Sequence, residues 1–219
     1  TDLRGGEIVS CELTETRMYL KGVNRRLELD VKPGDTVQAG FVLSNSEVGA
    51  GSVRVEPLLY RLVCSNGMIV PDYGQKRYHM GRILESEENR EIFRDETLAA
   101  DDKAFFLKVQ DTVQLAIDQA KFAHLVGRLR DTTGQFISGN PVRAVEILAG
   151  RHMLTQEESG GLLKHLIQGG DLSRYGLINA VTRVSQDMAD YDRATELERL
   201  GGQLMTLEPR QWNDLATAA

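Results

Sequence analysis

A change in hydrophobic periodicity at about residue 84 constrains the fold of this chain more than any other feature. Residues 26–31 (RLELDV) alternate polar and apolar side chains, and this period of two is typical of a half-buried β-strand. Beyond residue 84 apolar side chains recur every three or four positions, which is the period of an amphipathic helix. The change predicts an α+β protein, with an antiparallel β-sheet over residues 1–83 and helices over 84–219. At 219 residues, both parts fit one compact domain.

Turn signals divide residues 7–70 into strands, and the short connections between them imply antiparallel pairing. The sequence KPGD at 32–35 predicts a turn, because proline fixes φ and glycine relaxes the backbone. The dipeptide Asn66-Gly67 predicts a hairpin turn, because both residues tolerate positive φ. Pro57 predicts a bulge or a sheet edge, because it cannot donate a hydrogen bond to a neighbouring strand. We expect strands at 7–13, 17–23, 26–31, 37–43, 53–64 and 68–70.

The helical part is predicted to begin with one long amphipathic helix, followed by a small helical bundle. Residues 96–130 carry an apolar stripe at helical spacing, formed by Phe106, Val109, Val113, Ile117, Ala120 and His124. Asn140 followed by Pro141 is typical of a helix start, and Thr155 with Glu158 forms the pattern of a capping box. We expect the helices of the bundle at 140–149, 155–170, 177–188 and 193–207.

The distribution of charge separates the two parts of the chain. The net charge is −6, which argues against a generally basic coat for nucleic acid. Residues 1–83 hold 11 Lys and Arg against 10 Asp and Glu, whereas residues 84–219 hold 15 against 22. The acidity therefore belongs to the helical part, and the β-rich part has room for a local basic patch.

Sequence features that report on location point to a reducing, cytoplasmic compartment. No apolar run reaches the roughly 18 residues that a membrane helix needs, and residues 1–10 lack the apolar core of a signal peptide. Cys11 and Cys64 both lie in apolar, strand-like surroundings and form no C-x-x-C pair. We expect two reduced, buried thiols that pack as small apolar groups.

A search for catalytic patterns predicts no enzyme, no catalytic residue, no cofactor and no metal site. The sequence has no G-x-S-x-G elbow, no Walker A loop and no G-x-G-x-x-G. The carboxylates at 85, 87, 88 and 91 could hold a divalent metal, but such runs more often form the solvated start of a helix. None of the four histidines has a partner at metal-ligand spacing; these are His79, His124, His152 and His165.

Basic and aromatic residues are interleaved in the β-rich part, a pattern that suits phosphate contacts and base stacking on single-stranded nucleic acid. Arg17, Tyr19 and Lys21 share one strand face because side chains alternate along a strand, and Arg25 and Arg26 are expected in the turn that follows. The alternative is an ordinary solvated sheet face, which interspersed acidic residues favour. The predicted nucleic-acid-binding residues are Arg17, Tyr19, Lys21, Arg25, Arg26, Arg54, Arg61, Lys76, Arg77 and Tyr78.

Three segments resemble a known family. They are residues 41–67, containing NSEVG and YRLVCSNG, residues 77–81 (RYHMG) and residues 175–182 (YGLINAVT). In order and spacing they resemble the phage/plasmid-like protein family, also described as domain of unknown function 932, over about residues 30–190. Longer members of that family carry a further N-terminal portion. The resemblance implies a mobile-element or prophage origin and brings no catalytic residues with it.

A sheet followed by long helices is also similar, at the level of fold, to the single-strand annealing proteins of phage recombination. The first hypothesis is therefore sequence-independent binding of single-stranded DNA in mobile-element DNA metabolism or recombination, with self-association into a homo-oligomer. The second is a protein-interaction or assembly module that acts on a host protein through its acidic helical surface. A metal-dependent enzyme at residues 85–91 ranks third.

Overall fold

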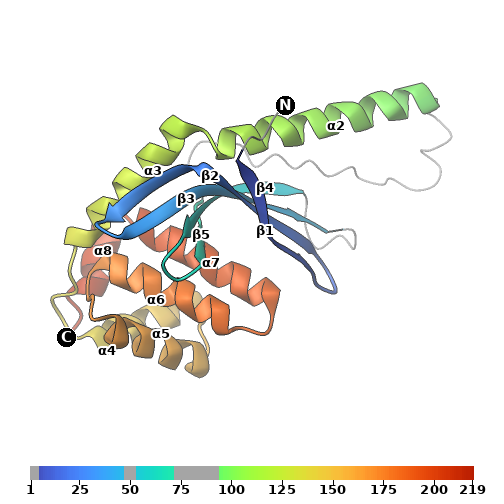
Figure 1. Ribbon diagram of the computed structural model, residues 1–219. Coiled ribbons are helices and arrows are strands. Elements are labelled where there is room, and N and C mark those ends of the chain that lie inside the picture. The colour runs from blue at the N-terminus through green and yellow to red at the C-terminus, as the bar shows by residue number, and fades with distance from the viewer. Residues whose placement is uncertain (1–4, 47–52, 72–93) are drawn as a thin grey trace.

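The computed structural model describes residues 5–46, 53–71 and 94–219 (Figure 1). Its β-part is a five-stranded antiparallel sheet in which each strand pairs with the next along the chain. Short connections between the strands explain this simple order. The predicted α+β class with an antiparallel sheet is confirmed. The strands are β1 (Gly6–Leu13), β2 (Met18–Lys32), β3 (Asp35–Asn45), β4 (Arg54–Arg61) and β5 (Asn66–Ile69).

The helical part follows the sheet in the chain and packs on both of its faces. Helices α2 and α3 lie on one side of the sheet, and α6 and α7 lie on the other (Figure 1). One large apolar cluster joins strand residues such as Val37 and Met68 to residues of the helices. The helices are α2 (Asp95–Ala116), α3 (Gln119–Asp131), a 3-10 turn η1 (Thr132–Gly134), α4 (Pro141–His152), α5 (Gln156–Gly169), α6 (Arg174–Asp187), α7 (Tyr191–Thr206) and α8 (Pro209–Ala216).

Strand β2 is one continuous element, which corrects the predicted division at residues 24–25. The pairing of β2 with β3 shifts register between Asn24 and Glu28, so the extra residues form an irregularity within the strand. Arg25 and Arg26 lie at this irregularity and not in a turn. The turn at 32–35 is confirmed, because Gly34 has a φ of +77° between β2 and β3.

The turn between β4 and β5 lies earlier than predicted. Residues 62–65 form the turn, and Ser65 takes the positive φ of 52°. Asn66 and Gly67 instead begin β5, where they pair with Arg61 and Tyr60. A Cβ atom on Gly67 would lie 2.8 Å from Leu58, so close packing on β4 accounts for the glycine.

The predicted single helix over 96–130 is two helices. Helix α2 ends at Ala116, and the side chain of Asp118 caps α3 by accepting a hydrogen bond from the Lys121 backbone amide at 2.9 Å. The predicted apolar stripe is also wrong at its ends, because Phe106 is 69% exposed and His124 is exposed. Helix α3 turns a different face to the core, formed by Phe122, Leu125, Val126 and Leu129.

The later helices begin and end close to where the capping signals predict. Thr155 and Glu158 form the expected capping box, with hydrogen bonds of 3.2 and 2.8 Å. Gly170 ends α5 in the left-handed conformation with a φ of +63°. Among the described helices, none is long and apolar enough to span a membrane.

The two cysteines are both free, but neither is buried as predicted. Cys11 is exposed, because β1 is an edge strand and most of its residues face solvent. Cys64 is half-buried in the turn between β4 and β5.

Candidate functional site

The sheet face predicted to bind nucleic acid is largely covered by helix α7. Tyr19 does share a face with Lys21, but its side chain is 0% exposed. Its hydroxyl donates to Asp192 Oδ1 at 2.5 Å, and its ring lies 5.3 Å from the ring of Tyr191. Tyr19 is therefore a buried packing residue, and the expectation that it stacks on bases is corrected.

Lys21 is enclosed beneath the same helix. Its ammonium group donates to both carboxylate oxygens of Glu198 at 2.7 Å, and the residue is only 7% exposed. A neighbouring pair joins Arg199 of α7 to Glu56 of β4 at 2.6 Å. Because α7 supplies a carboxylate to Lys21 and closes over it, Lys21 has no access to a phosphate in this structure.

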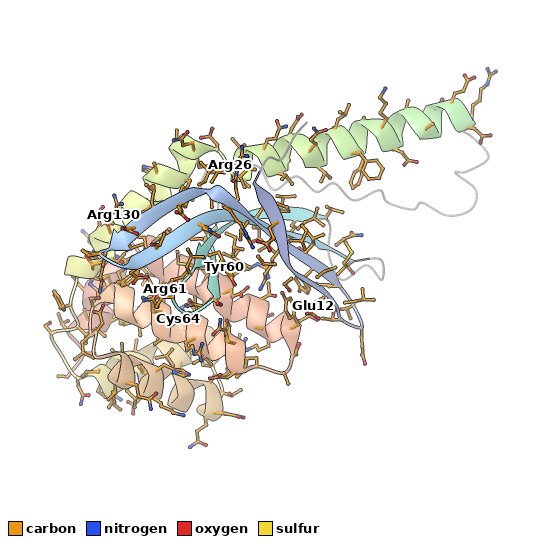
Figure 2. The ribbon with its side chains drawn as sticks, viewed as in Figure 1. Glu12, Arg26, Tyr60, Arg61, Cys64 and Arg130 are labelled. Atoms are coloured by element: carbon orange, nitrogen blue, oxygen red, sulfur yellow. The ribbon has the colours of Figure 1, made fainter. Side chains whose placement is uncertain are left out.

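The remaining predicted residues do not form one surface. Arg25 pairs with Glu7, and Arg26 is exposed beside α2 and α3 (Figure 2). Arg54 is exposed at the opposite end of β4 from Arg61. Arg17 lies beside the Tyr19 hydroxyl. Lys76, Arg77 and Tyr78 lie outside the described residues.

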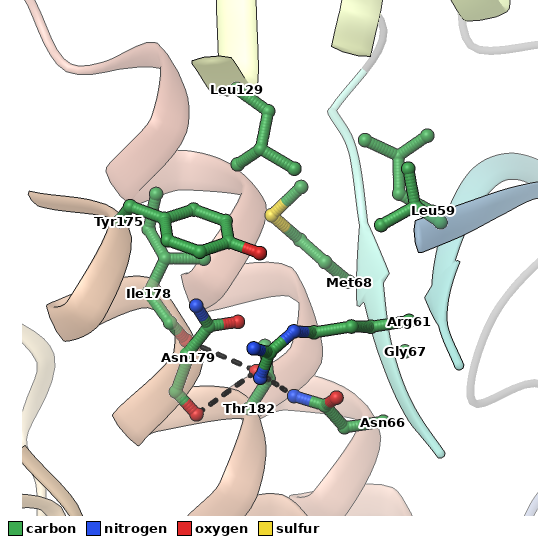
Figure 3. A pocket seen from close by; sticks show the side chains of 11 residues that line it. Leu59, Arg61, Asn66, Gly67, Met68, Leu129, Tyr175, Ile178, Asn179 and Thr182 are labelled. Carbon is green, nitrogen blue, oxygen red and sulfur yellow. Dashed lines mark hydrogen bonds between the residues drawn. The ribbon is translucent and has the colours of Figure 1, made fainter. Parts of the chain in front are cut away.

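Arg61 points into a polar pocket at the end of the sheet. The pocket has a volume of about 460 Å³ and lies between the two strand turns, helix α5 and helix α6. A smaller cavity of about 20 Å³ adjoins it and shares several of its lining side chains (Figure 3). The polar side chains that line the pocket include Lys32, Asp35, Arg61, Asn66, Asp171 and Asn179.

A buried network fixes the wall of the pocket on the sheet side. Arg61 donates to both carboxylate oxygens of Asp35, at 2.6 and 2.7 Å, and the Tyr175 hydroxyl donates to the same carboxylate at 2.7 Å. Burial alone would raise the pKa of Asp35, but its bonds to Arg61 and Tyr175 hold that pKa below its ordinary value. Burial, with the adjoining carboxylate, raises the pKa of Tyr175. The carboxylate is therefore ionised and the phenol neutral at pH 7.

A second ion pair closes the wall on the helix side. Lys32 pairs with Asp171, and its ammonium lies 4.7 Å from the centre of the Tyr175 ring. Burial favours a higher pKa for Asp171, but its interactions with Lys32 and Ser173 together outweigh burial and lower the pKa. Asp171 also accepts from the Ser173 backbone amide at 3.0 Å, just before α6 begins. A Cβ atom on Gly176 would lie 1.7 Å from the Asp171 carbonyl oxygen, so this close approach requires glycine.

Two carboxamides occupy the inner end of the pocket. The amide nitrogen of Asn66 donates to the Thr182 hydroxyl at 2.6 Å, and that hydroxyl donates in turn to the Ile178 carbonyl at 3.1 Å (Figure 3). The Oδ1 atom of Asn66 is buried and has no hydrogen-bond partner among the described residues. Asn179, one turn after Tyr175 on α6, is half-buried and lines the same space.

The outer rim of the pocket carries exposed cationic and polar groups of α5 and α6. Arg183 is exposed, and its guanidinium bonds to the neutral side chain of Gln186. His165 Nε2 lies 2.9 Å from an Asp187 carboxylate oxygen. Gln186 also donates to the backbone carbonyls of Cys64 and Ser65, at 3.0 and 2.8 Å. Helix α6 and the β4–β5 turn are therefore tied together at the rim.

The pocket has an excess of positive charge in a protein whose net charge is −6. Two carboxylates, Asp35 and Asp171, face three permanent cations, so the lining carries one extra positive charge before His165 is counted. The cations are Lys32, Arg61 and Arg183. Within the described ranges, no group of three or more His, Cys, Asp or Glu side chains could hold a metal ion. The carboxylates at 85–91 lie outside these ranges. The polar and cationic lining of the pocket can form hydrogen bonds and attract an anion.

Sequence analysis found only Arg61 among the pocket residues. Asn66 was interpreted as a turn residue, and Asn179 and Arg183 were not predicted as site residues. One signal was present, because the segments 60–67 and 175–182, which carry the family resemblance, both line this pocket. Their convergence required the fold, since they come from β4–β5 and from α6.

The fold and the pocket define an α+β protein with a polar pocket at one end of its sheet. A family model described as Domain of unknown function (DUF932) matches residues 11–129, which is more than half of the chain. The chain therefore belongs to this family, as the resemblance predicted. The match starts and ends earlier than the expected 30–190, so segment 175–182 lies beyond it. No curated protein and no solved structure matches the chain. The fold-level likeness to phage annealing proteins stays a prediction.

Proposed function

We propose that this protein binds single-stranded DNA by holding one nucleotide unit in the pocket between the sheet and α5–α6. The observation that carries the proposal is the gathering of cations and carboxamides around about 460 Å³ of space in an otherwise acidic protein. Ligand pockets in proteins commonly measure roughly 300–1,000 Å³. The proposal keeps the ligand expected from the sequence and moves its site away from the sheet face.

The rim supplies the contact for the phosphate. Arg183 is exposed and its side-chain partner Gln186 is neutral, so its charge is not compensated by that contact. A guanidinium matches a phosphate with two parallel hydrogen bonds, which makes arginine a frequent phosphate ligand. Lys32 and Arg61 lie deeper, and their positive charge adds to the attraction although each has a carboxylate partner.

Such a site takes one nucleotide of a strand without reading a long sequence. It suits the sequence-independent role in mobile-element DNA metabolism or recombination that the family resemblance implies. The proposal is one of binding and includes no chemical step. The alternative, an assembly module that works through the acidic helical surface, remains as the second candidate.

The direct test is fluorescence anisotropy of a labelled oligothymidylate, with duplex DNA of the same length as the comparison, over a salt series. The informative variant is Arg183→Gln. Arg143→Gln is its matched control, because both arginines are exposed on helices and each bonds to the side chain three residues later. We expect Arg183→Gln to weaken single-strand binding about 10-fold, the scale of one charge-assisted hydrogen bond. Arg143→Gln should leave binding unchanged.

Cys64 offers a second, independent measurement. It lines the pocket, whereas Cys11 is exposed on β1 and serves as an internal reference. We expect a saturating oligonucleotide to slow alkylation of Cys64 and to leave the rate at Cys11 unchanged. Competition with thymidine monophosphate then shows whether a free nucleotide reaches the same site as the strand.

Two outcomes contradict the proposal. Equal losses in the Arg183→Gln and Arg143→Gln variants would show that binding is general electrostatic attraction to the surface. Absence of binding to any oligonucleotide at low salt would remove DNA as the ligand and favour the protein-interaction alternative.

A further inference from the structure

We infer that the inner end of the pocket is a recognition site for the edge of a nucleobase, formed by Asn66 and Asn179. This inference rests on the proposed function and deepens it, because it names the part of the nucleotide that the inner end of the pocket holds. It assigns the phosphate to the rim and the base to the carboxamides.

The carboxamide of Asn66 has a fixed orientation. The Thr182 hydroxyl donates its one proton to the backbone of α6, where the Ile178 and Asn179 carbonyl oxygens lie 3.1 and 3.3 Å away. It can therefore only accept from Asn66, whose amide nitrogen lies at 2.6 Å. The Oδ1 atom of Asn66 must then face the other way.

Within the part of the chain that the structure describes, this oxygen lacks a partner although the residue is only 4% exposed. Buried carboxamide oxygens almost always accept a hydrogen bond, because an unmade bond leaves the loss of hydration uncompensated. Asn66 borders both the large pocket and the adjoining cavity of about 20 Å³, which has room for one water molecule. The unpaired acceptor therefore belongs to a residue that borders the pocket, where a donor from a bound molecule would complete its hydrogen bond.

Helix α6 arranges the groups in order from floor to rim. Tyr175, Asn179 and Arg183 follow one another at four-residue spacing, so they lie on one face of the helix, and all three line the pocket. Successive members are one turn apart, about 5.4 Å along the axis. A ligand with its anionic group on Arg183 therefore presents its other end to Asn179 and Asn66.

The chemistry of the inner end selects a planar group with hydrogen-bond donors. A carboxamide both donates and accepts in one plane, and for this reason Asn and Gln form paired hydrogen bonds with base edges. Asn66 offers only its oxygen, so the ligand must present a hydrogen-bond donor to it, whereas Asn179 can complete a second bond. Nucleobases carry amino or imide N–H donors in the plane of the ring, whereas inorganic phosphate is not planar.

The test is isothermal titration calorimetry on the full chain with deoxynucleoside monophosphates, 2-deoxyribose 5-phosphate and inorganic phosphate as ligands. We expect the nucleotides to bind at least 10-fold more tightly than the sugar phosphate. Asn179→Leu, which keeps the size of the half-buried side chain, should bring nucleotide affinity down to that of the sugar phosphate. Arg183→Gln should weaken both ligands by the same factor. Thermal unfolding of each variant checks that it is folded, and Asn179→Gln should restore part of the discrimination.

The outcomes separate this inference from the proposed function. If nucleotides and 2-deoxyribose 5-phosphate bind equally well and Asn179→Leu has no effect, the phosphate site stands and base recognition is overturned. If Asn179→Leu weakens both ligands alike, its role is structural and the inference is likewise overturned. If no phosphate-bearing ligand binds the wild type, both the proposed function and this inference are overturned.

Discussion

Two lysines of strand β2 form ion pairs in very different surroundings. Lys21 pairs with Glu198 beneath α7, where the pair is almost fully enclosed. Lys32 pairs with Asp171 at the other end of the strand, where a pocket of about 460 Å³ remains open beside the pair. Both pairs join β2 to the helical part, and both lysines also lie over a tyrosine ring.

Pairing alone therefore does not distinguish a structural charge from one that is available to a ligand. What distinguishes them is whether a helix closes over the pair. Helix α7 covers the sheet face at Lys21, whereas a pocket remains between the end of the sheet at Lys32 and helices α5 and α6.

Removal of Glu198 should have the largest effect. Glu198→Ala leaves Lys21 buried without its carboxylate, and breaking a buried pair in this way costs about 3–5 kcal/mol of unfolding free energy. Urea denaturation measures the loss. Glu196→Ala is the control, because Glu196 is exposed and its pair with Arg193 contributes at most about 1 kcal/mol. Similar losses in the two variants would contradict the contrast between buried and open pairs.

Replacement of Asp35 should cost less. Asp35→Asn removes the charge that accepts from Arg61 and Tyr175, and hydrogen bonds to a charged group contribute about 1.5–3 kcal/mol. We expect a loss of about 2 kcal/mol by the same measurement. Asp30→Asn, an exposed carboxylate in the same hairpin, should change stability by less than about 0.5 kcal/mol.

Acid should weaken the pocket wall over a defined range. The pKa values of Asp35 and Asp171 are lowered in the folded protein, so their ion pairs stabilise it fully above the ordinary carboxyl pKa of about 3.9. That contribution is lost as the pH falls through the folded pKa values. We expect the unfolding free energy of the wild type to decrease below about pH 4 more steeply than that of Asp35→Asn. Parallel curves for the two proteins would contradict the role of Asp35.

Substitution at the rim of the pocket should hardly change the stability of the protein. Arg183 is exposed, so Arg183→Gln should change the unfolding free energy by less than about 0.5 kcal/mol. The same variant is expected to lose DNA affinity, and the combination would separate binding from folding. A loss of stability comparable to that of Asp35→Asn would place Arg183 in the structural framework.

Local signals predicted much of the fold. The turn at 32–35 and the capping box at Thr155 are short-range patterns, and both are present. The prediction of a hairpin turn at Asn66-Gly67 was wrong, because a dipeptide that favours turns can also lie in a strand. Here Gly67 allows close packing against Leu58. The break between α2 and α3 was missed because helical spacing of apolar residues continues across Asp118, whose capping role depends on the path of the chain.

The candidate site was predicted far less well. Alternation correctly placed Tyr19 and Lys21 on one face, but no nearby residue shows that α7 covers that face. The pocket depends on three separate segments, and its carboxamides at 66 and 179 are ordinary polar residues until the fold brings them together. Arg61 was named from its charge, and only its contact with Asp35 shows which way it points.

Because α7 covers the sheet face, this face can be buried only after α7 has been synthesised. Tyr19 and Lys21 bond to residues that follow 173 and 177 positions later. At a synthesis rate of about 5–20 residues per second, the strands leave the ribosome roughly ten seconds or more before their cover. During that interval the nascent sheet presents an uncovered face to other chains. Docking of α7 therefore covers this face and protects it from aggregation with other chains.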